Sequence, residues 1–143
     1  MKNKRGFTLI ELLVVIGIIV FLFVLGVIAL GSARQQARDS KRLSDLRAVQ
    51  AHMEWYFADH NAYPIIQAPG LVLGDPNSSC LNAAGFGPKG CAAAYLDSIP
   101  ADPGDGKYIY VSTDGTSYVI NSMLEGNVNG LQGPIKVTPS GIQ

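Results

Sequence analysis

Hydrophobic and polar positions divide the 143-residue chain into an apolar N-terminal run and a mixed remainder. In residues 7–30, 20 of 24 positions are hydrophobic, and Glu11 carries the only charge. A helix of this length spans about 36 Å at about 1.5 Å per residue, which is enough to cross a hydrocarbon layer of about 30 Å. The pattern therefore predicts a transmembrane helix over residues 7–30.

After the apolar run, hydrophobic residues recur at spacings of three and four, as in an amphipathic helix. They are Leu43, Leu46, Val49, Met53, Tyr56 and Phe57. Arg38, Arg42 and Asp45 are expected to lie away from this stripe. Pro64 is the first proline, and the residue before a proline avoids the α region. One helix is therefore predicted over residues 8–60.

The C-terminal half alternates between turn-rich and β-rich segments. Residues 65–97 are rich in Gly, Pro, Asn and Ala without a sustained period, so they are predicted to form a long loop. Residues 107–113 and 116–124 are β-rich and are joined by Asp114-Gly115, a strong hairpin signal. Residues 135–138 are expected to add a third strand.

Counting outwards from this turn gives an expected register for the hairpin. It pairs Val111 with Tyr118 and Ile109 with Ile120 on the face towards the helix, and Tyr110 with Val119 on the other face. The predicted fold class is α+β: a long N-terminal helix packed on a small antiparallel sheet.

The zero net charge hides an uneven distribution. Three basic residues precede the apolar run, and five follow it before position 48. Residues 48–143 hold three lysines against eight acids. This acidic remainder lacks the broad basic surface that nucleic acids require, so no nucleic-acid partner is expected.

Motifs of catalysis are also missing from the sequence. There is no GxSxG, no HExxH and no CxxC, and the literal GxGxxG match at residues 85–90 contains a proline and follows no predicted strand. We therefore expect no enzyme activity.

Two features disagree about the orientation of the apolar run. Five basic residues after it against three before it favour a C-terminus inside the cell. Cys80 and Cys91 instead indicate a disulfide formed outside the cytosol. A cleaved secretory signal ending near Ser32 is disfavoured, because the apolar core of such signals runs about 7–15 residues. Glu11 would have no use in such a signal.

The segment Lys2-Asn3-Lys4-Arg5-Gly6-Phe7-Thr8-Leu9-Ile10-Glu11-Leu12-Leu13 closely resembles the class III signal of type IV pilins and the pseudopilins of type II secretion. In that family a prepilin peptidase cuts after the glycine on the cytoplasmic side and methylates the new amino terminus. The resemblance implies cleavage after Gly6 and a mature N-terminus at Phe7, with Glu11 as the fifth mature residue.

The same resemblance implies a division of the chain. Residues 1–6 would be a cleaved basic leader, 7–30 a transmembrane and filament-core helix, and 31–60 the amphipathic helix of the head. Residues 61–143 would form the rest of an extracytoplasmic head. The five basic residues after the apolar run would then face lipid headgroups or acidic faces of neighbouring subunits.

Cleavage would create a charged amine at Phe7 in apolar surroundings, where an unpaired charge is costly. The resemblance implies that Glu11 of an incoming subunit pairs with the Phe7 amine of its neighbour and so sets the rise between subunits. The implied function is a structural subunit of a type IV pilus-like filament. The alternatives are a major pseudopilin of a type II secretion system and a membrane-anchored binding domain that does not polymerise.

The implied partners are other copies and related pilins, the prepilin peptidase, the membrane, and the assembly platform and ATPase of a pilus or secretion machine. The implied location is the bacterial cytoplasmic membrane for a single-pass precursor with its head outside. After assembly, a cell-surface or periplasmic filament is expected.

Two candidate sites remain in the head. A disulfide between Cys80 and Cys91 would close a loop of about ten residues and stabilise by roughly 2–3 kcal/mol. The acidic turn Asp102-Pro-Gly-Asp105-Gly106, with Asp114 nearby, offers oxygen ligands for calcium. Major pseudopilins have a calcium site in a loop of this neighbourhood, although the tryptophan often found there is missing. The alternative is a turn with a structural role only, and no other cofactor is expected.

Overall fold

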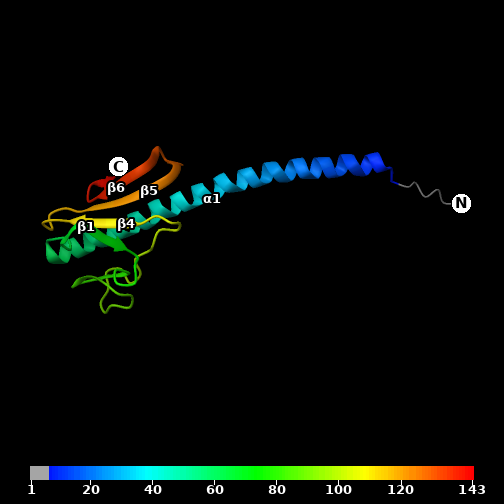
Figure 1. Cartoon of the computed structure of the whole chain (residues 1–143). Coiled ribbons are helices and arrows are strands. Elements are labelled where there is room, and N and C mark those ends of the chain that lie inside the picture. Colours follow the sequence, from blue (N-terminus) through cyan, green and yellow to red (C-terminus); the bar gives the residue numbers. More distant parts are fainter. Residues whose placement is uncertain (1–6) are drawn as a thin grey trace. The chain divides into compact units, whose positions relative to one another are not determined.

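The computed structural model describes residues 7–143. It contains one long helix, α1 (Leu9–His60), followed by seven strands (Figure 1). The strands are β1 (Ile66–Leu73), β2 (Cys80–Asn82), β3 (Gly85–Gly87), β4 (Tyr108–Ser112), β5 (Val119–Val128), β6 (Leu131–Thr138) and β7 (Gly141–Ile142). Gly6 and the leader lie outside the described residues.

Backbone contacts divide the chain into two compact units, Met1–Gln35 and Gln36–Gln143. In the first unit, the apolar side chains of α1 are exposed, from 44% at Val15 to 82% at Leu9. In the second unit, one face of α1 is buried by the sheet, which confirms the predicted α+β class.

Helix α1 has the predicted limits to within one residue. Its C-terminus is formed by Asn61, which adopts a left-handed φ of 54° and donates its N–H to the Phe57 carbonyl at 2.7 Å. Asparagine tolerates this conformation, which closes the last turn of a helix.

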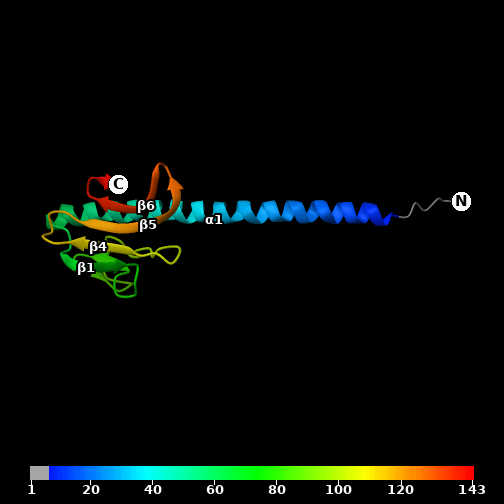
Figure 2. The ribbon, with the colours of Figure 1, turned by 45° about the horizontal axis from the view of Figure 1, so that its top comes forward.

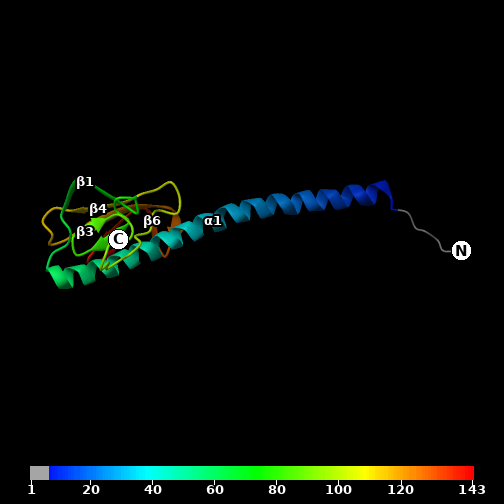
Figure 3. The same ribbon diagram turned by 90° about the horizontal axis from the view of Figure 1, so that it is seen from below.

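The second unit contains a five-stranded antiparallel sheet in the order β1-β4-β5-β6-β7 (Figure 2). The predicted third strand is present as β6 and is longer than expected. Strands β2 and β3 pair separately as a two-stranded hairpin. Figure 3 shows the strands gathered along one side of the C-terminal half of α1.

The predicted register of β4 and β5 is wrong by one residue. Tyr110 pairs with Ile120 and Val111 with Val119. The predicted register instead pairs Tyr110 with Val119 and Val111 with Tyr118. A shift of one residue moves side chains to the opposite face of a strand.

The consequence of this shift is visible in β4. Tyr108 and Tyr110 are fully buried, whereas Ile109 and Val111 are only half-buried. The two tyrosines therefore take the inward places predicted for Ile109 and Val111. Tyr118 and Ile120 are buried as predicted.

The turn explains the difference. The connection between β4 and β5 comprises residues 113–118 rather than the two residues of a tight hairpin. Asp114 accepts hydrogen bonds from the Thr116 N–H at 2.9 Å and from the Thr116 hydroxyl at 2.8 Å. This local bonding builds a wider loop, so counting from Asp114-Gly115 gives the wrong partners.

The predicted long loop over residues 65–97 is also wrong in part, because it contains three strands. Strand β1 forms the edge of the sheet beside β4, with an irregularity between Ile66 and Leu71. Gly70 lies there with φ of 102°, and a Cβ at this position would come within 2.8 Å of the Tyr110 carbonyl oxygen. The irregularity breaks the alternation of period two that identifies a strand.

Candidate functional site

Helix α1 begins with a capping box formed by Thr8 and Glu11. The Glu11 carboxylate accepts the Thr8 N–H at 2.9 Å and the Thr8 hydroxyl at 2.8 Å. The Glu11 N–H donates to the Thr8 hydroxyl oxygen at 3.3 Å. These reciprocal bonds satisfy backbone donors that a helix start leaves open. The Thr-x-x-Glu spacing is the sequence signal for this cap, and the predicted role of Glu11 in assembly did not include it.

Phe7 and Glu11 share the surface at this helix start. They line a shallow apolar groove of about 320 Å³ with Ile10, Val14 and Val15, and the Phe7 side chain is 77% exposed. Glu11 lies about one helical turn from Phe7. Gly6 lies outside the described residues, so the predicted cleavage site is represented only by its Phe7 side.

The apolar part of α1 is the only helix of the described residues that is long and apolar enough to cross a membrane. Its exposed side chains form a continuous hydrophobic surface, and a surface of this size marks contact with lipid or with another protein. A long apolar N-terminal helix of this kind fits membrane anchoring.

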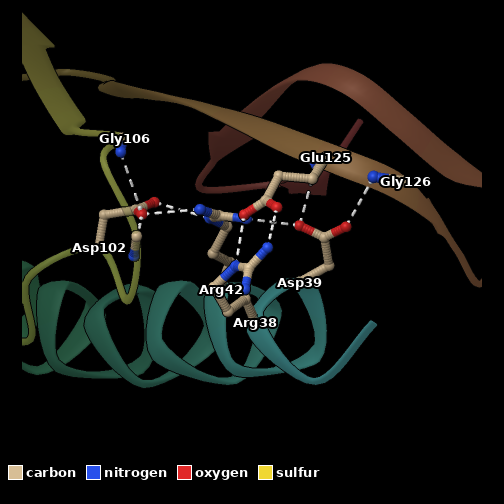
Figure 4. Close-up of polar contacts among 8 residues, drawn as sticks. Arg38, Asp39, Arg42, Asp102, Gly106, Glu125 and Gly126 are labelled. Atoms are coloured by element: carbon tan, nitrogen blue, oxygen red, sulfur yellow. Dashed lines mark hydrogen bonds and ion pairs between the residues drawn. The ribbon is translucent and has the colours of Figure 1, made fainter. Parts of the chain in front are cut away.

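The second unit contains a charged group that we call the Arg42 cluster: Arg38, Asp39, Arg42, Asp102 and Glu125 (Figure 4). The Arg42 guanidinium donates from Nε to Asp102 Oδ2 at 2.7 Å and from Nη2 to Asp102 Oδ1 at 2.8 Å. Its Nη1 donates to Asp39 and to Glu125, each at 2.7 Å. Arg38 adds two further donors to Glu125.

The acids of the cluster are also held by backbone groups. Asp39 accepts the N–H of Glu125 at 3.0 Å and that of Gly126 at 2.8 Å, which joins α1 to β5. Asp102 accepts the N–H of Gly104 at 2.8 Å and that of Gly106 at 3.3 Å. The cluster therefore ties α1, the turn before β4 and strand β5 together.

Space is tight at the two glycines of the turn after Asp102. A Cβ on Gly104 would lie 2.9 Å from Arg42 Nη2, and a Cβ on Gly106 would lie 2.8 Å from Asp102 Oδ2. The sequence Asp-Pro-Gly-Asp-Gly therefore forms a turn that packs closely against one buried ion pair.

The ion pairs shift the pKa values of the acids. The Arg42 guanidinium lowers the pKa of Asp102, and Arg38 followed by Arg42 lowers that of Glu125 to about 2. Burial raises the pKa of Asp39, but the Glu125 N–H and Arg42 outweigh it, so the net shift is downwards. The hydrogen bonds that Arg42 donates to these carboxylates, first of all to Asp102, raise the pKa of Arg42. Every acid of the cluster is therefore ionised at neutral pH.

The prediction that Arg42 and Asp45 lie away from the buried stripe is wrong. Asp39, Arg42 and Asp45 are all buried, and Arg38 is half-exposed. Positions 39, 42 and 46 share a helix face at spacings of three and four, so the periodicity already placed charged residues among the apolar ones. Buried charges require partners, and apart from Asp39 the partners of Arg42 lie 60 and 83 positions away in the sequence.

The structure does not bring the three candidate calcium ligands together. Asp102 precedes β4 and binds Arg42 with both carboxylate oxygens, and Asp105 is exposed on the same turn. Asp114 follows β4 and accepts hydrogen bonds from Thr116. No group of three His, Cys, Asp or Glu residues suited to a metal ion occurs within residues 7–143. The calcium hypothesis stays a prediction, and the geometry gives Asp102 a different role.

The two cysteines form a disulfide, Cys80 to Cys91, with Cα atoms 6.2 Å apart. Cys80 begins β2 and is buried, and its neighbour Leu81 pairs with Leu96. The disulfide therefore closes the segment that contains the β2–β3 hairpin. It has the structural role that its spacing indicated.

These features, an apolar helix start with one carboxylate and a helix packed on a small antiparallel sheet, define a pilin-like protein. The family model of the prokaryotic N-terminal methylation motif matches residues 1–33. The type II secretion system core protein G of Escherichia coli K12 is 32% identical over 110 residues, which cover 77% of this chain and 73% of that protein.

Two further relatives extend this comparison. Core protein G of Vibrio cholerae is 28% identical over 134 residues, covering 91% of this chain and 87% of that protein. The type IV wide pilus major component PilA4 of Thermus thermophilus is 40% identical over 74 residues, covering 52% and 56%. No solved structure matches the chain at a significant level. The chain belongs to the family of type IV pilins and type II secretion pseudopilins.

Proposed function

We propose that the chain is a structural subunit of a type IV pilus-like filament. It is made as a membrane precursor, cut between Gly6 and Phe7, methylated at Phe7 and polymerised through the apolar part of α1. The exposed apolar surface of residues 7–30 carries this proposal, because a filament core covers that surface once the subunit leaves the lipid.

Glu11 is the residue on which assembly depends in this proposal. It is the only charge within residues 7–30, and it lies about one turn from the new amine at Phe7. The amine of one subunit and the Glu11 carboxylate of another neutralise each other in the apolar core, and a wrong register would leave both charges unpaired. The pair thereby fixes the rise between subunits.

A second candidate is a major pseudopilin of a type II secretion system, a short filament in the periplasm. The matches to core protein G, which cover most of the chain, favour this candidate. In both candidates the partners are copies of the chain and related pilins, the prepilin peptidase, and the assembly platform with its ATPase. The precursor lies in the cytoplasmic membrane with its second unit outside.

Mass spectrometry of the mature protein tests the processing step. An N-methylated Phe7 is expected, and an N-terminus at Met1 or near Ser32 would contradict the proposal. Electron microscopy of sheared cells then distinguishes long pili from short pseudopili.

A variant tests the assembly step. Glu11→Ala is expected to insert and to be cleaved normally but to be missing from sheared filaments. Normal filaments from this variant would remove the assembly role of Glu11. A processed wild-type chain that forms no filament would support a membrane-anchored binding domain instead.

A further inference from the structure

A second groove lies in the unit Gln36–Gln143, where α1 meets the end of β5. It has a volume of about 290 Å³ and is lined by Ser40, Leu43, Ser44, Arg47, Val128 and Asn129. Ser40, Ser44 and Arg47 follow one another at spacings of four and three, so they share one face of α1. The groove thus combines one guanidinium, two hydroxyls and one amide with the apolar side chains of Leu43 and Val128.

Arg47 differs from the other cations on this part of the helix. Arg38 pairs with Glu125, Lys41 with Asp45, and Arg42 with the acids of its cluster. Within residues 7–143, Arg47 has neither an ion pair nor a side-chain hydrogen bond, and it is exposed. A guanidinium beside hydroxyl and amide donors is a receptor for a carboxylate.

The same unit carries exposed carboxylates near the C-terminal end of α1, where Asp59 follows Arg47 by 12 residues. Helix α1 ends there at His60, directly after Asp59. The loop that carries Asp114 lies beside this end, because the Tyr63 N–H donates to the Gly115 carbonyl at 2.8 Å. Asp59 and Asp114 are both exposed. We call these two residues the acidic end.

We propose that the Arg47 groove of one copy binds the acidic end of a second copy. Charge complementarity supports a second copy as the occupant, since the unit presents an unpaired guanidinium midway along its part of α1 and two exposed carboxylates near the C-terminal end of that helix. Asp114 is already held in one orientation by Thr116, which favours binding without further ordering.

Such a contact is heterologous, because it joins two different surfaces of the same protein. Each bound copy keeps one free groove and one free acidic end, so the contact repeats and builds an open filament rather than a closed dimer. The inference rests on the proposed filament function. It adds a contact between heads to the pairing of Phe7 and Glu11.

Charge reversal tests this contact in cells that assemble the wild-type chain into filaments released by shearing. Arg47→Glu and Asp114→Arg are each expected to lower the amount of sheared filament at least tenfold. The double variant Arg47→Glu/Asp114→Arg is expected to restore a clear part of it. Lys136→Glu is the matched control, because it makes the same charge change on an exposed position of β6 and should assemble normally.

The outcomes separate the inference from the function on which it rests. If Arg47→Glu assembles at the wild-type level, or the double variant is no better than the singles, the contact is wrong. If the wild-type chain itself gives no filament or lacks methylated Phe7, the proposed function fails first. Equal amounts of each variant in the membrane, with the Cys80–Cys91 disulfide formed, show that folding is unchanged.

Cross-linking gives a second measurement that does not depend on filament yield. Full chains carrying Arg47→Cys with Asp114→Cys, or Arg47→Cys with Asp59→Cys, are oxidised in sheared filaments. At least one pair is expected to give a ladder of covalent multimers. Each single cysteine variant should give no ladder. The lack of a ladder from both pairs would overturn the contact.

Discussion

Arg42 and Asp102 are separated by 60 residues in sequence and form a bidentate ion pair, with N–O distances of 2.7 and 2.8 Å. Both side chains are almost fully buried, at 3% and 2% exposed. A paired guanidinium and carboxylate in this geometry is directional as well as attractive. The pair fixes the turn before β4 on α1.

Replacing Arg42 by Met should destabilise the second unit by about 3–5 kcal/mol, because it leaves Asp39 and Asp102 buried without their cation. Arg42→Lys should destabilise less but still measurably, since an ammonium cannot form the fork of two parallel bonds. The measurement is urea unfolding of the full chain in detergent, followed by the near-ultraviolet circular dichroism of the buried tyrosines. Arg47→Met, at an exposed position, should stay within about 0.5 kcal/mol of wild type. A similarly small effect of Arg42→Met would contradict this role.

Alanine at Gly104 or Gly106 should destabilise by about 1–3 kcal/mol, because each new Cβ would meet the ion pair at under 3.0 Å. Gly87→Ala is the matched control, since a Cβ there meets nothing within 4 Å. The same urea unfolding experiment compares the three variants. Equal midpoints for all three would show that the turn does not need its glycines.

Much of the fold could be predicted because its signals are local. The limits of α1 followed from the apolar run, the stripe and Pro64, and the pairing of Cys80 with Cys91 followed from a pair of cysteines with no competing ligands. Strand β1 could not be found, because Gly70 and an irregular register interrupt its alternation. The register of β4 and β5 depended on a turn type that Asp114-Gly115 alone does not specify.

The charged cluster is the largest feature that the sequence did not reveal. The periodicity of α1 placed Asp39 and Arg42 among apolar neighbours, but their partners Asp102 and Glu125 are set by tertiary packing. The glycines after Asp102 indicated a turn with a specific role, and the calcium hypothesis made Asp102 a metal ligand. The structure instead gives the same carboxylate to a guanidinium.

Acid should destabilise the second unit in a defined range of pH. Asp102 and Glu125 have pKa values lowered in the folded state, so their stabilising effect is complete above their ordinary values near 4 and is lost as pH falls through the folded values. For Glu125 this range runs from about 4.5 to about 2. The thermal midpoint of the wild-type chain should therefore fall between pH 5 and pH 2, in a buffer series at about constant ionic strength. Arg42→Met should show a shallower fall, and an identical slope would contradict the assignment.

Chelators test the calcium hypothesis against the ion pair. Because Asp102 already binds Arg42 with both oxygens, we expect EDTA to leave the thermal midpoint of the wild-type chain unchanged. Added calcium should likewise have no effect beyond that of magnesium at the same concentration. A midpoint that falls with EDTA and recovers with calcium alone would restore Asp102, Asp105 and Asp114 as candidate ligands.

Two variants separate the two roles that Glu11 combines, its charge and its helix cap. A glutamine at this position can still accept the Thr8 N–H, as Glu or Gln does in a capping box, but it carries no charge. If the pairing with the Phe7 amine drives assembly, Glu11→Gln should be cleaved and methylated normally and should lose most sheared filament. Thr8→Val is the complementary variant, because it removes the Thr8 hydroxyl bonds at 2.8 and 3.3 Å and keeps the carboxylate. It should reduce filament yield less than Glu11→Gln, whereas the reverse order would show that the helix cap rather than the charge controls assembly.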